Sequence, residues 1–474
     1  MPYFTPQLFL QVIQNQCRSA HHLFQVQTLL LTSGLLHPHF PISNSNPNRN
    51  SNANATSRST FFYNTLIRAH LHLQNPYNSL LLFTHMLAHP SPPNSHTFPS
   101  LIQAASSFPP TGKSIHAQVI RRGLSLDLFV NSCTVKFYAQ LGELPDARQT
   151  FDEIAWPDIV SCNSMLDALC KNGDADSALN LFGRMPERDV VSWTSIINGF
   201  ARNRQSRDAI QWFGRMITMH EVRPNEATLV SILSACANLD GGALYQGRQI
   251  HAYVIKSEVP VTTFLGTALI DMYGKSSCLG YAWKVFREMT ERGVCTWNAI
   301  ISSLASNSRE LEALDEFEKM RLEGMQPNGV TYVGLLTACA RAGLVELGLE
   351  WFNSMSQDYG IVPTMEHYGC VVDLLGRAGL LEDAAEFIRK MPMEADATVW
   401  GALLGACKVH GNVELGGAAG QRLIELQPRH SGWYVVLSNM YAGAGRWGDA
   451  TLFRELMAKE GVKKSAGYSR LLDL

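Results

Sequence analysis

The chain is 474 residues long, 46% of them hydrophobic, and it carries a formal net charge of −2. This length exceeds what one hydrophobic core usually organises, so several domains or an elongated repeat array are expected. The near-neutral charge argues against one broad basic face for nucleic acid, and no apolar run is long enough to span a bilayer.

The N-terminal region, residues 1–58, is basic and contains no acidic residue, and the first acid in the chain is Asp127. An acid-free start with Ser and Arg is typical of organelle transit peptides. Residues 7–40 resemble one degenerate unit of the repeat that follows. The Asn/Ser tract that fills 41–58 and runs on to Thr60 has almost no core-forming residues, so we expect a disordered loop there.

Residues 59–396 repeat one pattern about every 35 residues. In the second half of five units an alanine precedes a phenylalanine by four residues, about one helical turn, so both lie on one helix face. The small residue lets a neighbouring helix approach, and the ring fills the gap beside it. These pairs are Ala147/Phe151, Ala178/Phe182, Ala209/Phe213, Ala282/Phe286 and Ala313/Phe317. First halves such as VVSWTSIINGF (190–200) also have helical spacing of apolar residues.

Glycines and prolines separate these segments. Glycine between the two halves supplies the left-handed residue that ends a helix, as at Gly142, Gly173, Gly343 and Gly379. Proline closes units because it blocks helix continuation, as at Pro93, Pro224 and Pro327. Each unit is therefore predicted to be a helical hairpin that buries its apolar face only when hairpins stack. The units are 60–94, 95–127, 128–158, 159–189, 190–225, 226–262, 263–293, 294–328, 329–364 and 365–396.

Three stretches, YNTLI (63–67), GRMPERDVVSWTSIINGFARN (183–203) and GRQIHAYVIKSE (247–258), resemble plant pentatricopeptide repeat proteins. The alternating unit lengths resemble the PLS class, in which the unit at about 7–40 would be L-type. Residues 397–474 resemble the E extension (E1 and E2), with the E+ segment expected to be cut short. The resemblance implies an all-α, right-handed superhelical solenoid of helix-turn-helix repeats, similar to tetratricopeptide arrays.

Many PLS proteins end in a DYW domain, a zinc deaminase module that needs His-x-Glu and Cys-x-x-Cys. Neither spacing occurs in the sequence. The chain therefore resembles an E-subgroup member without its own deaminase, and we expect no enzyme activity, no catalytic residue, no metal site and no cofactor. The ten cysteines are expected to be mostly buried thiols.

In the family, the fifth and last residues of each unit together read one RNA base. Carried over unit by unit, the pairs are Asn64 with Asn94, Ser132 with Asp158, Asn163 with Asp189, Thr194 with Asn225, Thr267 with Gly293, and Asn298 with Asn328. By the family's code they would read C (or U less well), G, U, A, a purine and C. L units have Pro99, Val230 and Val333 at the fifth place, and Gly369 follows in the last unit, so no base is assigned to them.

The implied target is C/U-n-G-U-A-n-(A/G)-C-n-n, with the array running parallel to the RNA from 5′ to 3′. Second-place residues would flank the bases through stacking or apolar contact, namely Phe61, Phe129, Val160, Val191 and Phe264. A fifth-place Asn could alternatively be a helix N-cap. The recurrence of Asn and Thr at the fifth place of successive units favours base reading.

The function implied is site recognition in C-to-U editing of organellar transcripts, with a DYW-type deaminase and other editing factors recruited through the E region. The partners expected are single-stranded organellar RNA and these proteins, with no membrane and no DNA. The mitochondrion is favoured over the chloroplast. Alternatives are a splicing or transcript-stabilising factor and, from another class, a protein–protein scaffold.

Three further signals are expected to carry no chemistry. TGKS (111–114) resembles the end of a P-loop, but Ser107 stands where that motif needs glycine. His367 and His410 are predicted to be packing or capping groups rather than metal ligands.

Overall fold

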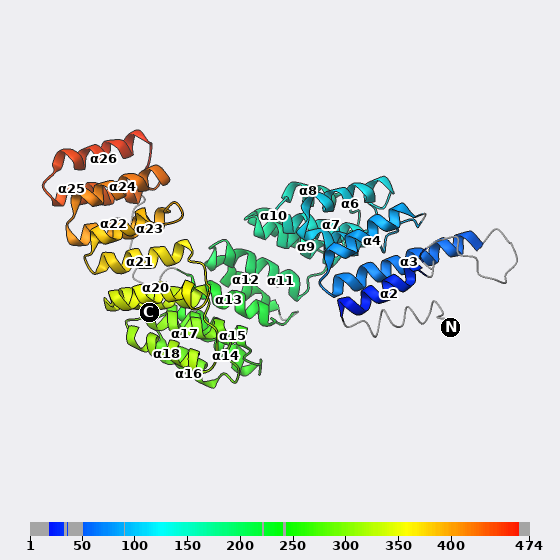
Figure 1. The fold of residues 1–474 in the computed structure, drawn as a ribbon, viewed down its shortest axis with the longest axis horizontal. Helices are drawn as coiled ribbons and strands as arrows, with labels where there is room; N and C mark the ends of the chain where they lie inside the picture. The colour runs from blue at the N-terminus through cyan, green and yellow to red at the C-terminus, as the bar shows by residue number, and fades with distance from the viewer. Residues whose placement is uncertain are drawn as a thin grey trace. The chain divides into compact units, whose positions relative to one another are not determined.

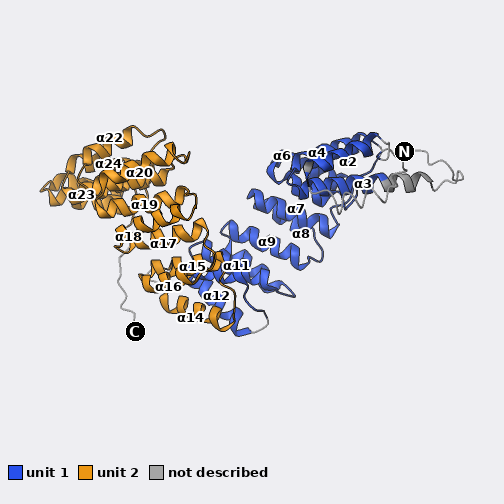
Figure 2. Cartoon of the chain, turned by 60° about the horizontal axis from the view of Figure 1, so that its bottom comes forward, with its two compact units in different colours: residues 1–235 blue, residues 236–474 orange. Residues whose placement is uncertain are grey.

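A computed structural model describes residues 19–32, 36, 51–89, 91–219, 222–239 and 243–463, with side chains described throughout except at residue 20 and residues 51–58. Within these ranges all regular structure is helical, which confirms the all-α class. The chain divides into two compact units, Met1–Ala235 and Cys236–Leu474, and the division falls inside helix α13 (Figure 2).

The helices of the first unit run from α2 to the greater part of α13. Their bounds are α2 Ala20–Thr32, α3 Ser51–His72, α4 Pro76–Ala88, α5 Phe98–Ala104, the 3-10 turn η1 Ala105–Ser107, α6 Pro109–Arg121, α7 Leu128–Leu141, α8 Leu144–Asp152, α9 Ile159–Lys171, α10 Ala175–Arg184, α11 Val190–Arg202, α12 Ser206–Met219 and α13 Glu226–Ala237.

The second unit continues the same alternation to the last described helix. Its helices are α14 Leu244–Lys256, α15 Thr263–Lys275, α16 Leu279–Glu288, α17 Val294–Ser306, α18 Glu310–Leu322, α19 Gly329–Ala342, α20 Val345–Gln357, α21 Met365–Arg377, α22 Leu381–Arg389, α23 Ala397–His410, α24 Val413–Leu426, α25 Ser431–Gly443 and α26 Trp447–Lys459.

Within each unit the repeats are antiparallel hairpins in which the first helix, here called the A helix, packs on the second, the B helix (Figure 1). In the first unit the A helices α3, α5, α7, α9 and α11 also contact one another in succession. In the second unit α15, α17, α19, α21 and α23 do the same. The predicted stack of hairpins is thus confirmed within each unit, while the superhelical hand of the whole chain stays a prediction.

The predicted Ala/Phe stripe lies where it was expected, on the inner face of the B helices. All five alanines are buried, as are Phe182, Phe286 and Phe317, whereas Phe151 and Phe213 are partly buried. Phe182 meets Trp193 of the next A helix edge-on with ring centroids 5.0 Å apart, and Phe286 meets Trp297 at the same distance. At these two junctions the stripe therefore joins one hairpin to the one that follows it.

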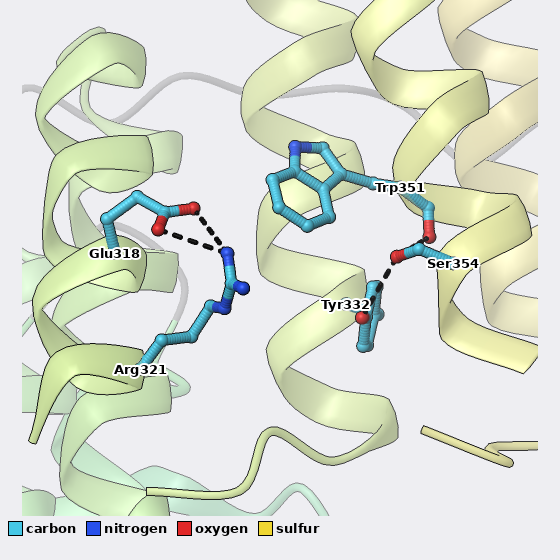
Figure 3. A network of polar contacts seen from close by, with 5 residues as sticks. All are labelled: Glu318, Arg321, Tyr332, Trp351 and Ser354. Carbon is cyan, nitrogen blue, oxygen red and sulfur yellow. Dashed lines mark hydrogen bonds and ion pairs between the residues drawn. The ribbon is translucent and has the colours of Figure 1, made fainter. Parts of the chain in front are cut away.

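Polar contacts reinforce this packing between α18, α19 and α20 (Figure 3). Arg321 donates to both carboxylate oxygens of Glu318, at 3.0 and 3.1 Å, and its guanidinium carbon lies 5.9 Å from the ring centre of Trp351. The hydroxyls of Tyr332 and Ser354 are 3.3 Å apart. A cation over an aromatic face adds attraction to the burial of the ring.

The turn residues have the predicted conformation. Gly142, Gly173, Gly343 and Gly379 all have positive φ, between 70 and 78°. Four other hairpins place a residue with a side chain in this left-handed region, and these residues are Gln74, Arg204, Ser277 and Ser308. Glycine adopts this left-handed conformation at no steric cost. Glycines between helical segments therefore indicated these turns in the sequence.

The predicted loop over the Asn/Ser tract is wrong for residues 51–60, because α3 begins at Ser51. Adding residues to an existing helix costs little once its core-facing part, with Phe62 and Tyr63, is fixed by packing. Residues 41–50 and the first half of the degenerate unit lie outside the described residues. His367 is buried and its Nδ1 lies 2.8 Å from the Thr364 hydroxyl in a capping box, which confirms its predicted capping role.

A modest stability effect is expected at Asp174, the N-cap of α10. Its carboxylate accepts from the backbone N–H of Ser177 at 3.1 Å and pairs with Arg148 at 3.0 Å. Asp174→Ala should lower the free energy of unfolding by about 1 kcal/mol, as measured by urea denaturation. Glu187→Ala removes the same charge from an exposed turn and should change it less.

The effect of Asp174→Ala should also depend on pH. The hydrogen bonds from Ser177, with Arg148 nearby, hold the pKa of Asp174 below its usual value. A carboxylate with a lowered folded pKa stabilises the fold above its unfolded pKa and loses that contribution as pH falls through the folded value. The difference between the two proteins should therefore be full at neutral pH and shrink in acid.

Candidate nucleic-acid interface

The side chain at the second place of the repeat unit projects into solvent in unit after unit. Phe61, Phe129, Val160, Val191 and Phe264 are 51, 63, 59, 47 and 72% exposed. Other apolar A-helix residues, such as Trp193 and Ile196, are buried. Exposed apolar side chains that recur at one helical position are free to contact a ligand that follows the row of A helices.

The fifth-place residues lie just beside this exposed row. Asn64, Asn163, Thr194 and Thr267 are half-buried, whereas Ser132 and Asn298 are only 5% exposed. All six lie inside helices, so the alternative that they are N-caps is wrong.

The N-caps are instead the last-place residues of the preceding unit. Asp158, Asp189, Asn225 and Asn328 each accept a hydrogen bond from the backbone N–H three residues on, at 2.8, 2.9, 2.9 and 3.2 Å. Such a cap uses one side-chain oxygen and stabilises the start of the next A helix. The last-place residue is thus fixed to the following hairpin.

Fifth and last residues meet directly wherever the fifth is asparagine. The Nδ2 of Asn163 donates to Oδ1 of Asp189 at 3.1 Å. Corresponding bonds join Asn298 to Asn328 at 3.0 Å and Asn64 to Asn94 at 3.1 Å. The structure therefore brings together three of the residue pairs predicted from the sequence.

A third residue completes each site. The Oγ of Ser192, the third residue of the next A helix, donates to Oδ1 of Asn163 at 2.7 Å. Thr331 and Thr97 donate in the same way to Asn298 and Asn64, both at 2.7 Å. Sequence analysis did not predict these hydroxyls. A Ser or Thr three residues after a capping residue was the available signal, but that spacing is ordinarily explained by the cap alone.

Where the fifth residue is Ser or Thr, the third-place hydroxyl bridges it to the last residue. Thr194 and Thr228 hydroxyls are 2.6 Å apart, and Thr228 donates to Asn225 at 2.8 Å. Ser132 and Ser161 are 2.5 Å apart, and Ser161 donates to Asp158 at 2.6 Å. Thr267 meets Thr296 at 2.9 Å, but the last residue is Gly293, which has no side chain to continue the contact.

The charge on Asp189 fixes how the Asn163 amide is turned. Burial alone would raise the pKa of Asp189, but hydrogen bonds from Ser192 and Asn163 outweigh it and hold the pKa below its usual value. A carboxylate can only accept, so the amide must turn its NH2 group toward Asp189 and its oxygen toward Ser192. One N–H and one oxygen lone pair of Asn163 remain for another partner.

The outer atom of each last-place side chain also remains for another partner. The hydrogen bonds from the backbone N–H three residues on all use Oδ1 of Asp158, Asp189, Asn225 and Asn328. Each site therefore presents an acceptor where the last residue is aspartate and a donor where it is asparagine.

Basic residues form a second row at the thirteenth place of the A helices. Eleven residues after the second place is three helical turns, so both places share a face. The exposed residues in this row are Lys171, Arg202, Lys275, Arg341 and Arg377. Several pair with an acid on the same helix, as Lys171 does with Asp167. Sequence analysis missed this row, although its spacing was visible in the aligned units.

Other kinds of site find no support within the described ranges. No cluster of three or more His, Cys, Asp or Glu side chains there could hold a metal ion. None of the described helices combines the length and hydrophobicity that crossing a membrane requires. Burial raises the pKa of Cys170 and Cys236 to about 12, so these thiols are protonated at neutral pH.

Family models match several parts of the chain. PPR repeat models match residues 160–190, 267–294 and 366–394, and the PPR repeat family model matches 188–238 and 292–341. A pentatricopeptide repeat domain model matches 317–378, and an E motif model matches 410–471.

Individual proteins are similar along almost the whole chain. A pentatricopeptide repeat-containing protein of Arabidopsis thaliana is 48% identical over 98% of this chain and 96% of its own length. Another from the same plant, with "chloroplastic/mitochondrial" in its name, is 35% identical over 88% of this chain and 62% of its own. The crystal structure of the maize pentatricopeptide repeat protein PPR10 aligns with 97% of this chain and 74% of that chain, at 17% identity and a TM-score of 0.49.

Proposed function

The chain belongs to the pentatricopeptide repeat family, and we propose that it binds single-stranded RNA along the exposed faces of its A helices, reading one base per unit. The observation that supports this most is the side-chain triad of fifth, last and third-place residues, which recurs in the five units whose fifth residues are Asn64, Ser132, Asn163, Thr194 and Asn298. In RNA-binding proteins built from helical repeats, two or three side chains of each repeat recognise one base. The flanking apolar residues would contact base faces, and the basic row would contact phosphates.

The proposed target is C/U-n-G-U-A-n-(A/G)-C-n-n. The Asn163 site, with its carboxylate acceptor, suits uracil, and the Asn298 site, with its amide donor, suits cytosine. Hydroxyl sites at Ser132 and Thr194 leave room for a purine. Ser132 and Asn298 are the most buried readers, so a base would have to approach these two closely.

Binding measurements on short RNAs test this proposal. Scrambling G-U-A should weaken binding by more than about tenfold, because each lost base contact costs on the order of 1 kcal/mol. Changing the bases marked n, which face units such as that of Val333, should leave affinity nearly unchanged. Equal affinity for target and scrambled RNA in a gel shift would contradict the proposal.

For the biological role we propose site recognition in C-to-U editing of an organellar transcript. The E motif at residues 410–471 supports this role, because the family resemblance implies that a deaminase is recruited through this region, and the organellar name of one relative supports the location. Sequencing organellar cDNA from a plant line lacking the protein tests it. One or a few cytidines left unconverted is the expected result, whereas full conversion with an unspliced intron would reassign the protein to splicing.

A further inference from the structure

The third place of the repeat unit carries an inference that rests on the proposed function and deepens it. We propose that the buried hydroxyl at this place is a positioning residue for base reading, because it orients the fifth-place side chain of the preceding hairpin. The residues concerned are Thr97, Ser161, Ser192, Thr228, Thr296 and Thr331. Each reader would then be assembled from two successive hairpins and not from one.

Within this chain, Ser or Thr occupies the third place only where the fifth residue of the preceding unit is polar. All six of them follow a unit whose fifth residue is Asn, Ser or Thr. Four units have Pro, Val or Gly at the fifth place, and no hydroxyl follows any of them. The third-place residues after these four units are Val130, Leu265, His367 and Val399.

Burial makes this match informative. All six hydroxyl residues are 0% exposed, as are Val130, Leu265 and Val399 at the same place. The third place is therefore a core position, where an aliphatic side chain is the less costly choice and a hydroxyl must find a partner. The fifth-place residue supplies that partner, with oxygen contacts of 2.5–2.9 Å in all six units.

Helix capping alone does not explain the hydroxyls, although those of Ser192 and Thr331 also accept from the N-cap backbone N–H in capping boxes. Asp127 caps α7 by accepting from the backbone N–H of Val130 at 3.1 Å, and Asp396 caps α23 by accepting from Val399 at 3.0 Å. These caps work with an aliphatic third residue. The fifth residues before them are Pro99 and Gly369, which offer no polar group.

The hydroxyl should therefore affect discrimination between bases more than it affects folding. With the Thr331 hydroxyl in place, the oxygen of Asn298 is engaged and its NH2 group faces Asn328. Without the hydroxyl, the amide loses the contact that keeps it from turning over and exchanging its donor and acceptor edges. An unoriented amide accepts more than one base.

Thr331→Val tests this in the full-length chain, because valine keeps the shape of threonine and removes only the hydroxyl. The probe is the proposed target RNA with each of the four bases in turn at the position facing Asn298. The ratio of affinities for C over U should fall about three- to tenfold, which is what one net hydrogen bond contributes. Thr331→Ser should restore the ratio. Thr150→Val, at a buried threonine that bonds only its own helix, is the matched control and should leave the ratio unchanged.

Each outcome is decisive when the thermal unfolding midpoint is measured alongside. An unchanged ratio in folded Thr331→Val, whatever the shift of its midpoint, would overturn the inference and leave the proposed function intact. If the wild-type chain itself shows no preference at this position, the base assignment fails and the inference fails with it. Ser192→Ala, with Ser192→Thr as its conservative partner, repeats the test at the Asn163 site should Thr331→Val not fold.

Discussion

Replacing Asp189 with asparagine should change the base preferred at its position from U to C, and Asn328→Asp should change C to U at the later position. Aspartate and asparagine both have an Oδ1 that can accept hydrogen bonds from the backbone N–H of the next helix and from the fifth-place amide, as Asp189 and Asn328 do. Only the outer atom differs, and the exchange turns an acceptor into a donor or the reverse.

Base chemistry gives the direction of the change. Uracil carries a donor at N3 beside the acceptor O4, whereas cytosine carries an acceptor at N3 beside an amino donor at N4. The carboxylate oxygen of Asp189 can accept from the uracil N3–H but can only repel the lone pair of cytosine N3. A mismatched pair leaves a partly buried polar group without its partner, which costs about 1–3 kcal/mol, so each preference should reverse by about tenfold or more.

The exchange should leave folding almost unaffected, since aspartate and asparagine are equally good N-caps. Binding to four RNAs that differ only at the relevant position measures the preference. Asp174→Asn is the matched control, because it makes the same chemical change at the cap of a B helix, away from the row of readers. A preference that stays with U in Asp189→Asn would show that the last-place side chain acts only as a helix cap.

The sequence was informative about the hairpins because their determinants are local. Helix-ending glycines such as Gly142, buried alanines such as Ala178 and rings such as Phe182 follow from spacing within one unit. The start of α3 was missed because polar Asn and Ser residues predict a loop, whereas the helix is extended from the packed segment around Phe62.

The site was only partly predictable because it spans two hairpins. Asn163 and Asp189 were named through a family resemblance, and neither residue alone distinguishes a reader from a cap. Ser192 was missed because its partner, Asn163, lies 29 residues earlier, and only the stacked hairpins show that the two side chains touch. Burial explains why Ser192 resembled a core residue when read one unit at a time.

Stacking of the hairpins should therefore control both stability and the proposed recognition. The proposed base-reading residues stand where consecutive A helices touch, so any change that separates two hairpins should also disturb the proposed base site between them. Trp297 is next to Asn298, a proposed base-reading residue, in α17 and is only 2% exposed, with its ring edge-on to Phe286 of the preceding hairpin.

Trp297→Ala should accordingly lower the free energy of unfolding by about 3–5 kcal/mol, the usual cost of removing a buried tryptophan ring. In a solenoid each hairpin is stabilised mainly by its neighbours, so the loss should begin around α15 to α19 and spread from there. Urea denaturation followed by circular dichroism gives the magnitude, and limited proteolysis gives the place of first cleavage.

Trp156→Ala is the matched control, because Trp156 is 87% exposed and its removal leaves no cavity. It should change the free energy of unfolding by less than about 0.5 kcal/mol. Under conditions where Trp297→Ala remains folded, it should weaken binding at the Asn298 position, because a cavity at the hairpin junction loosens the contacts between Asn298, Asn328 and Thr331. Equal stabilities of the two variants would mean that the junction can close around the missing ring, and recognition at Asn298 would then be independent of this packing.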